Sequence, residues 1–234
     1  MHRRTVLLAL FWLAAAAGCS QRDDPPPAST DRPAAKLPTP SQPPRPSRPR
    51  IVALGDSLTA GLGLEPGQAW PALIQARIDE AGYDYEVINA GVSGDTTAGG
   101  SRRLDWALNG DVKVLVLELG ANDGLRGLAP KEMRSNLAAM ITAAKGRDVT
   151  VLLCGMEAPP NFGADYTREF RATFADLAAE HDVAFIPFLL DGVAGDPALN
   201  QADGIHPNIE GSRRVAELVW RSLEPLLDRS AASS

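Results

Sequence analysis

The residues best suited to chemistry lie near the end of the chain, in the segment DGIHP at positions 203–207. A histidine can take and return a proton near neutral pH because its unperturbed pKa is about 6.5. Of the three histidines in the chain, His2 lies in an N-terminal leader and His181 ends an amphipathic stretch. His206 is therefore the predicted general base. Asp203, three residues earlier, is placed to accept a hydrogen bond from the imidazole Nδ1 and to orient the ring.

The predicted nucleophile for this base is Ser57, which follows the first apolar run of the domain. A serine hydroxyl reacts when an adjacent base removes its proton, so Ser57, His206 and Asp203 together predict acyl transfer. Pro207 biases His206 away from helical backbone angles and suits the first position of the last helix, which leaves the imidazole on a loop. Two structural interpretations stay open: Asp56 or Ser57 as only a helix N-cap, and Asp203 as an Asx turn before the helix.

Acyl transfer also needs hydrogen-bond donors for the oxyanion of its tetrahedral intermediate. The predicted donors are the backbone N–H groups of Ser57 and Gly94 and the side-chain amide of Asn122. Gly94 allows close backbone approach, and a helix beginning at Asp95 would add the positive end of its dipole. The alternative is that the segments around Gly94 and Asn122 are ordinary loops and turns.

Glu118 stands inside an otherwise apolar run, where an unpaired carboxylate would be costly. We expect it to form a structural pair with Arg102 or Arg103 rather than to react. No group of residues has metal-ligand spacing, and no glycine-rich phosphate loop follows the first predicted strand. The sequence therefore predicts a hydrolysis that uses neither a metal nor a cofactor.

The elements that must position these side chains alternate between short apolar runs and amphipathic stretches. Strands are predicted at residues 51–54, 85–88, 112–119, 149–153 and 183–186. This alternation favours an α/β fold with one five-stranded parallel sheet and helices on both faces. Ligands of such sheets bind beyond the carboxyl ends of the strands, and Ser57, Gly94 and Asn122 all follow strands directly.

The first 49 residues have a different character. Residues 1–18 combine two arginines, an apolar run and small residues, as in a secretory signal peptide, and are too short for a membrane span. Cys19 after Ala-Ala-Gly resembles a lipobox, whose cysteine is lipidated, and Ser20 resembles lipoproteins sent to the outer membrane. Cys154 is predicted to be a buried free thiol, which leaves Cys19 without a disulfide partner. Cleavage to a soluble periplasmic or secreted protein is the alternative.

The predicted organisation is a signal peptide at 1–18, a lipidated and disordered tether at 19–49, a hydrolase domain at 50–228 and a flexible tail at 229–234. Ten of the 19 prolines lie within residues 20–49, a composition that favours an extended chain. The formal net charge of −6 argues against the basic footprint of a nucleic-acid-binding protein. The expected partners are a small-molecule substrate and, through the lipid anchor, a membrane.

These motifs, in this order, resemble the blocks of the GDSL/SGNH hydrolases. The matching segments are GDSL at 55–58, Gly94, GAND at 120–123 and DGIHP at 203–207, across about residues 50–227. The resemblance implies a flavodoxin-like three-layer αβα sandwich and Ser57 as the nucleophile. It also implies that Gly94 and Asn122 contribute to the oxyanion hole and that Asp203 and His206 complete the triad.

The segments around these blocks are similar to the thioesterase I/lysophospholipase L1/arylesterase subgroup. They are AGLG at 60–63, SGDTT at 93–97 and NDGLRGL at 122–128. The resemblance implies hydrolysis of carboxylic esters and thioesters, with aryl esters, acyl-CoA and lysophospholipid-like molecules as substrate types. Two other functions stay open. One is an O-deacetylase of surface polysaccharide, which the same blocks support in related families. The other is a non-catalytic binding lipoprotein, against which the complete set of site residues argues.

Overall fold

The computed structural model describes residues 48–227. The predicted signal peptide, the lipid attachment site at Cys19, nearly all of the predicted tether and the C-terminal tail lie outside these residues. Within residues 48–227, no helix is both long and apolar enough to cross a membrane. Cys154 is a buried free thiol, as predicted.

Five strands form a single parallel sheet in the order β2-β1-β3-β4-β5. The strands are β1 (Arg50–Gly55), β2 (Glu86–Gly91), β3 (Val112–Glu118), β4 (Thr150–Cys154) and β5 (Ala184–Ile186). This order is the flavodoxin-like one, so the predicted fold class is confirmed. The order reverses between β1 and β3, so the loops after these two strands diverge and open a crevice at the carboxyl edge of the sheet.

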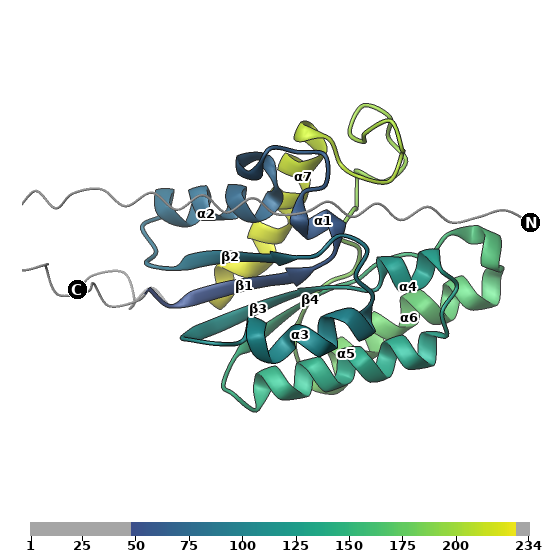
Figure 1. Ribbon diagram of the computed structural model, residues 1–234, viewed down its shortest axis with the longest axis horizontal. Helices are drawn as coiled ribbons and strands as arrows, with labels where there is room; N and C mark the ends of the chain where they lie inside the picture. The colour runs from purple at the N-terminus through teal and green to yellow at the C-terminus, as the bar shows by residue number, and fades with distance from the viewer. Residues whose placement is uncertain (1–47, 228–234) are drawn as a thin grey trace, which may run out of the picture. The chain divides into compact units, whose positions relative to one another are not determined.

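Helices cover both faces of the sheet and complete three layers (Figure 1). The α-helices are α1 (Ser57–Ala60), α2 (Trp70–Glu80), α3 (Thr97–Ala107), α4 (Ala121–Leu125), α5 (Pro130–Lys145), α6 (Ala164–His181) and α7 (Ile209–Leu223). Short 3-10 helices are η1 (Pro66–Gln68), η2 (Pro160–Phe162) and η3 (Glu224–Leu226). In Figure 1, α2 and α7 lie on one face, and α3, α5 and α6 lie on the other.

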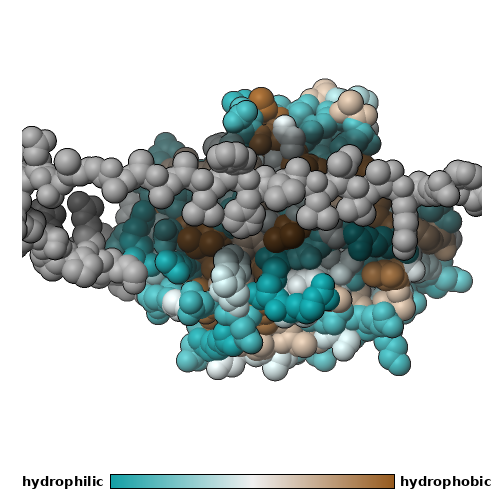
Figure 2. All heavy atoms as spheres, viewed as in Figure 1, coloured by the Kyte–Doolittle hydropathy of each residue, from teal (hydrophilic) through white to brown (hydrophobic). Residues whose placement is uncertain are grey.

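The core lies between these layers and gives each helix one buried side. Central strand β3 is buried along nearly its whole length, as expected for a strand covered on both faces. Helix α5 buries Met133, Leu137, Met140 and Ile141 against the sheet and its neighbours. In the space-filling view, the lower margin, where α5 lies, is mostly teal and white, which is its solvent side (Figure 2). The site is therefore built on a rigid, well-packed frame.

Two predicted helix starts are wrong. The helix expected from Asp95 begins at Thr97, because the Thr96 side chain caps it by accepting from Gly99 N. Asp95 instead pairs with Arg103 at 2.6 Å. Pro207 does not occupy the first position of the last helix, since α7 begins at Ile209 behind an Asn208 cap.

Candidate active site

Ser57 is the first residue of α1 and stands directly beyond the carboxyl end of β1. Asp56 caps this helix, since its Oδ1 accepts from Leu58 N at 3.0 Å. Gly55 precedes the turn, and a Cβ there would collide with the Thr59 hydroxyl and with Glu118. Only a glycine therefore lets the chain turn this sharply and present the Ser57 hydroxyl at the switch point of the sheet.

Asp203 and His206 lie on a short hairpin between β5 and α7. An isolated antiparallel bridge joins Asn200 to Pro207 at its base, and Gln201 N donates to His206 O at 2.8 Å. This pairing explains why Pro207 lies outside the helix. At the tip of the hairpin, Asp203 Oδ1 accepts from the backbone N–H groups of Ile205 at 2.9 Å and His206 at 3.0 Å.

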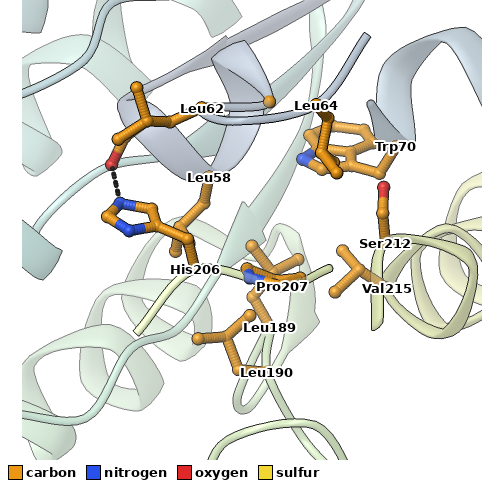
Figure 3. A pocket seen from close by; sticks show the side chains of 12 residues that line it. Leu58, Leu62, Leu64, Trp70, Leu189, Leu190, His206, Pro207, Ser212 and Val215 are labelled. Atoms are coloured by element: carbon orange, nitrogen blue, oxygen red, sulfur yellow. Dashed lines mark hydrogen bonds between the residues drawn. The ribbon is translucent and has the colours of Figure 1, made fainter. Parts of the chain in front are cut away.

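The side chains of Asp203, His206 and Ser57 form a continuous hydrogen-bonded chain. Asp203 Oδ2 lies 2.7 Å from His206 Nδ1, and His206 Nε2 lies 2.9 Å from Ser57 Oγ. Figure 3 shows the His206 imidazole, with this second contact drawn as a dashed line. The His206 side chain is 16% exposed, so most of the ring is enclosed by protein while part of it stays open to the groove. This arrangement can move a proton from the serine hydroxyl to the imidazole.

The carboxylate of Asp203 is stabilised in its charged form. Hydrogen bonds from the backbone N–H groups of His206 and Ile205, and then from the His206 ring, lower its pKa from 3.8 to about 2. Asp203 therefore stays an anion at neutral pH and can hold the imidazole in one orientation.

Gly94 and Asn122 reach the same groove as Ser57 from the neighbouring strands. Gly94 has φ of +83° in the turn that Asp95 N closes on Val92 O at 3.0 Å, a conformation that disfavours other residues. Asn122 is the second residue of α4, and its Nδ2 donates to Asp56 Oδ2 at 3.0 Å. An amide NH₂ has two donors, so the second N–H of Asn122 is free for a ligand.

The structure adds two site contacts that sequence reasoning missed. Asp56, interpreted only as a possible cap, also holds Asn122 through its second oxygen. Arg126 Nη2 donates to Gly94 O at 2.8 Å and so braces the turn that carries Gly94. The signal for Asp56 was its place directly before Ser57, whereas no spacing rule pointed to Arg126.

Glu118 does not pair with Arg102 or Arg103, so this prediction is wrong. Its Oε2 accepts from Thr59 Oγ1 at 2.6 Å and from Asp56 N at 3.2 Å. Glu118 is fully buried, and this desolvation, followed by the nearby charge of Asp56, raises its pKa well above the usual range. Its hydrogen bonds to Thr59 and Asp56 therefore support α1 from beneath.

Burial likewise raises the pKa of Asp56 to about 6, despite hydrogen bonds from Leu58 and Asn122 that lower it. Asp123 is also buried, but its two oxygens accept from the backbone and hydroxyl of Thr97 at 2.8 and 2.7 Å. Asp123 therefore orders its turn by holding Thr97.

Two cavities adjoin Ser57 and His206. The larger is an open groove of about 600 Å³ with mostly apolar walls. Leu62, Leu125, Met156, Pro160, Phe188, Leu190 and Ile205 are among the residues that line it. The smaller, behind the imidazole, has room for about 10 Å³ between Leu58, Trp70, Leu189 and Val215 (Figure 3). Only the groove can take a substrate. Within residues 48–227, no cluster of three or more histidine, cysteine or acidic side chains could hold a metal ion.

Known proteins are similar to this chain in both sequence and architecture. Esterase TesA of Pseudomonas aeruginosa is 46% identical over 178 residues, which cover 76% of this chain and 89% of the relative. Thioesterase 1/protease 1/lysophospholipase L1 of Escherichia coli K12 is 35% identical over 182 residues, covering 77% and 86%. A crystal structure of TesA, 45% identical, matches with a TM-score of 0.73 and covers 76% of this chain and 99% of the solved one.

A family model matches residues 53–214, the stretch that runs from β1 into α7 and contains Ser57, Gly94, Asn122, Asp203 and His206. By this match and by its similarity to these relatives, the chain belongs to the GDSL-like lipase/acylhydrolase family.

Proposed function

We propose that this protein is a serine esterase that hydrolyses carboxylic esters and thioesters of acyl and aryl type. The observation that carries the proposal is the hydrogen-bonded chain from Asp203 through His206 to Ser57, open to a groove with apolar walls. Membership of the acylhydrolase family supports it, as do the esterase and thioesterase names of the relatives.

In the proposed reaction, His206 Nε2 takes the proton of Ser57 Oγ while Oγ attacks the carbonyl carbon of the substrate. The carbonyl oxygen becomes an oxyanion that accepts hydrogen bonds from the N–H groups of Ser57 and Gly94 and from the amide of Asn122. His206 then gives its proton to the leaving alcohol or thiol, which departs and leaves an acyl-enzyme. A water molecule, deprotonated by His206, attacks the acyl carbon, and the released Ser57 Oγ recovers the proton.

The groove favours substrates with an apolar acyl or aryl part. Its volume of about 600 Å³ exceeds what an acetyl group needs, and Leu125, Met156 and Phe188 offer apolar contacts along it. The E. coli relative is named both a thioesterase and a lysophospholipase, in keeping with acyl substrates of some length.

We further propose that the mature protein is anchored in the cell envelope through lipidated Cys19, with the domain carried on the proline-rich segment that follows. The basis is the sequence of residues 1–49. A soluble periplasmic or secreted form would follow if an ordinary signal peptidase cleaved the leader instead.

The proposed activity predicts a burst of p-nitrophenol when the enzyme meets p-nitrophenyl butyrate, because acylation of Ser57 releases the phenol before water attacks. The burst amplitude should match the enzyme concentration in a stopped-flow measurement. Ser57→Ala should abolish the burst and reduce turnover by at least about 1000-fold, since only binding and oxyanion contacts remain.

Circular dichroism would establish that Ser57→Ala keeps the fold. Turnover by this variant at the wild-type rate would contradict the proposal. Release of acetate from an acetylated glycan, without hydrolysis of longer acyl esters, would instead favour a polysaccharide deacetylase.

A further inference from the structure

Exposed apolar side chains gather around the mouth of the groove. Six of them, here called the rim, are Leu62, Val92, Leu125, Leu128, Phe162 and Ile205, with exposed fractions between 38% and 46%. Each of the five strands contributes at least one rim residue from the segment that follows its carboxyl end. The rim is therefore assembled by the whole sheet.

The rim is continuous with the groove. Leu62, Leu125 and Ile205 line the groove and also reach its surface. Val92 directly precedes Ser93 and Gly94, two further lining residues. Beyond Leu125 the rim continues to Phe162, whose ring covers Gly127. A ligand leaving the groove would thus meet apolar surface in several directions.

Single exposed apolar residues are normal, but a group of them around a binding site marks an interaction surface. Trp106 provides the contrast, since it is 68% exposed in the last turn of α3. Helix α3 runs back from the carboxyl edge of the sheet, so Trp106 lies at the opposite end of the domain from the rim.

We propose that the rim docks on the surface of a lipid layer, so that acyl chains pass from the layer into the groove. The proposal rests on the proposed esterase function, because such substrates reside in lipid layers or micelles. Inserting the apolar rim removes its side chains from water, and this burial of apolar surface would drive docking.

The chain outside the described residues allows this orientation. The described residues begin at Arg48, next to the amino end of β1, while the rim surrounds the carboxyl edge of the sheet. A domain of this size is about 40 Å across, given a radius of gyration of about 16 Å. Residues 19–47, rich in proline, would reach about 90 Å if extended. A domain attached through Cys19 could therefore turn its rim toward the membrane that anchors it.

The test uses phosphatidylcholine vesicles and the chain from Ser20 onward, produced without acyl chains and carrying Ser57→Ala. The described residues form one hydrophobic core, and the solved TesA chain, matched over 99% of its length, corresponds to 76% of this chain. Co-sedimentation should show vesicle binding, and adding Leu128→Ser with Phe162→Ser should weaken it by about tenfold or more. Trp106→Ser, the matched control, should bind as the parent does.

In the active enzyme, Leu128→Ser with Phe162→Ser should leave turnover of monomeric p-nitrophenyl butyrate near the wild-type value, because neither residue lines the groove. If the double variant does not fold, Leu128→Asp alone replaces it as the rim variant in both measurements. Absence of vesicle binding by the parent chain would overturn the inference, as would equal binding by the rim variants. Rim-dependent dimers in place of vesicle binding would assign the surface to a second copy. Vesicle binding without a phenol burst would support the proposed docking of the rim and contradict the proposed esterase function.

Discussion

Asp203 stabilises its own loop and also orients the His206 ring. One of its oxygens accepts from the backbone N–H groups of Ile205 and His206, which is an Asx turn, and the other contacts the His206 ring. The two interpretations of Asp203 that the sequence left open, turn former and orienting group, are therefore compatible. The same bonds that shape the loop also keep the carboxylate charged.

Asn122 carries the most direct prediction at the scale of single residues. Asn122→Ala should lower kcat by roughly 100-fold or more and change KM little, because its amide is proposed to act mainly on the oxyanion of the transition state. Steady-state hydrolysis of p-nitrophenyl butyrate measures both constants.

Asn136→Ala is the matched control for this variant. The Asn136 amide is half-buried and donates to Thr97 Oγ1 at 3.1 Å, but it does not line the groove. This variant should keep kcat near the wild-type value. An unchanged kcat in Asn122→Ala would remove Asn122 from the oxyanion hole.

The residues that meet at the groove could be predicted where their types follow strands, as Ser57 and Asn122 do. The contacts from Asp203 to His206 and from His206 to Ser57 could also be predicted. The contacts that support them could not, because they depend on how separate strands align. Asp56 and Asn122 meet across 66 positions of sequence. The sequence shows that buried Glu118 needs a partner, but it does not show which one. Because Gly55 has no side chain, Thr59 and Glu118 can approach each other there, so the partner is Thr59 and not an arginine.

At the scale of elements, Asn208 links α7 to the hairpin that carries the base. Its Oδ1 caps the helix by accepting from Glu210 N and Gly211 N, and its Nδ2 donates to Ala198 O at 2.8 Å. Asn208→Ala should lower the free energy of unfolding by about 1–2 kcal/mol, the usual effect of losing a cap.

Urea unfolding at pH 7 measures this effect. Asn208→Ser keeps a capping oxygen but loses the amide donor, so its stability should lie between those of the wild type and Asn208→Ala. Equal stability of all three proteins would show that the cap contributes nothing.

Element types were predictable because apolar runs and helical periods alternate along the chain, whereas some boundaries were not. Asp95 looked like a helix start, but a partner eight residues later competes for its carboxylate. Arg103 binds Asp95 and also donates to the carbonyls of Ala90 and Gly55, so it ties together the ends of β1 and β2. This tertiary role has no signature in local sequence.

At the scale of the whole molecule, Asp203 links stability to pH. Its pKa is lowered from 3.8 to about 2 in the folded state, so its charged form stabilises folding above about pH 4. As the pH falls from about 4 to about 2, the unfolded chain takes up the proton first and this contribution is lost.

Urea unfolding of the wild type and Asp203→Asn at pH 5, 4, 3 and 2.5 isolates this contribution, because other groups titrate alike in both. The stability difference between the two proteins should shrink as the pH falls. A difference that stays constant with pH would contradict the lowered pKa.

The hairpin between β5 and α7 carries His206 and Asp203 as one unit, with Ser57 on a separate element. A shift of this hairpin would change the distance from His206 to Ser57 while the internal geometry of the Asp203–His206 pair stayed intact. The hairpin itself therefore sets the orientation of the imidazole, whereas its docking on the domain sets the distance to Ser57. Gln201 contributes to this docking, since its Nε2 donates to Leu62 O at 2.7 Å.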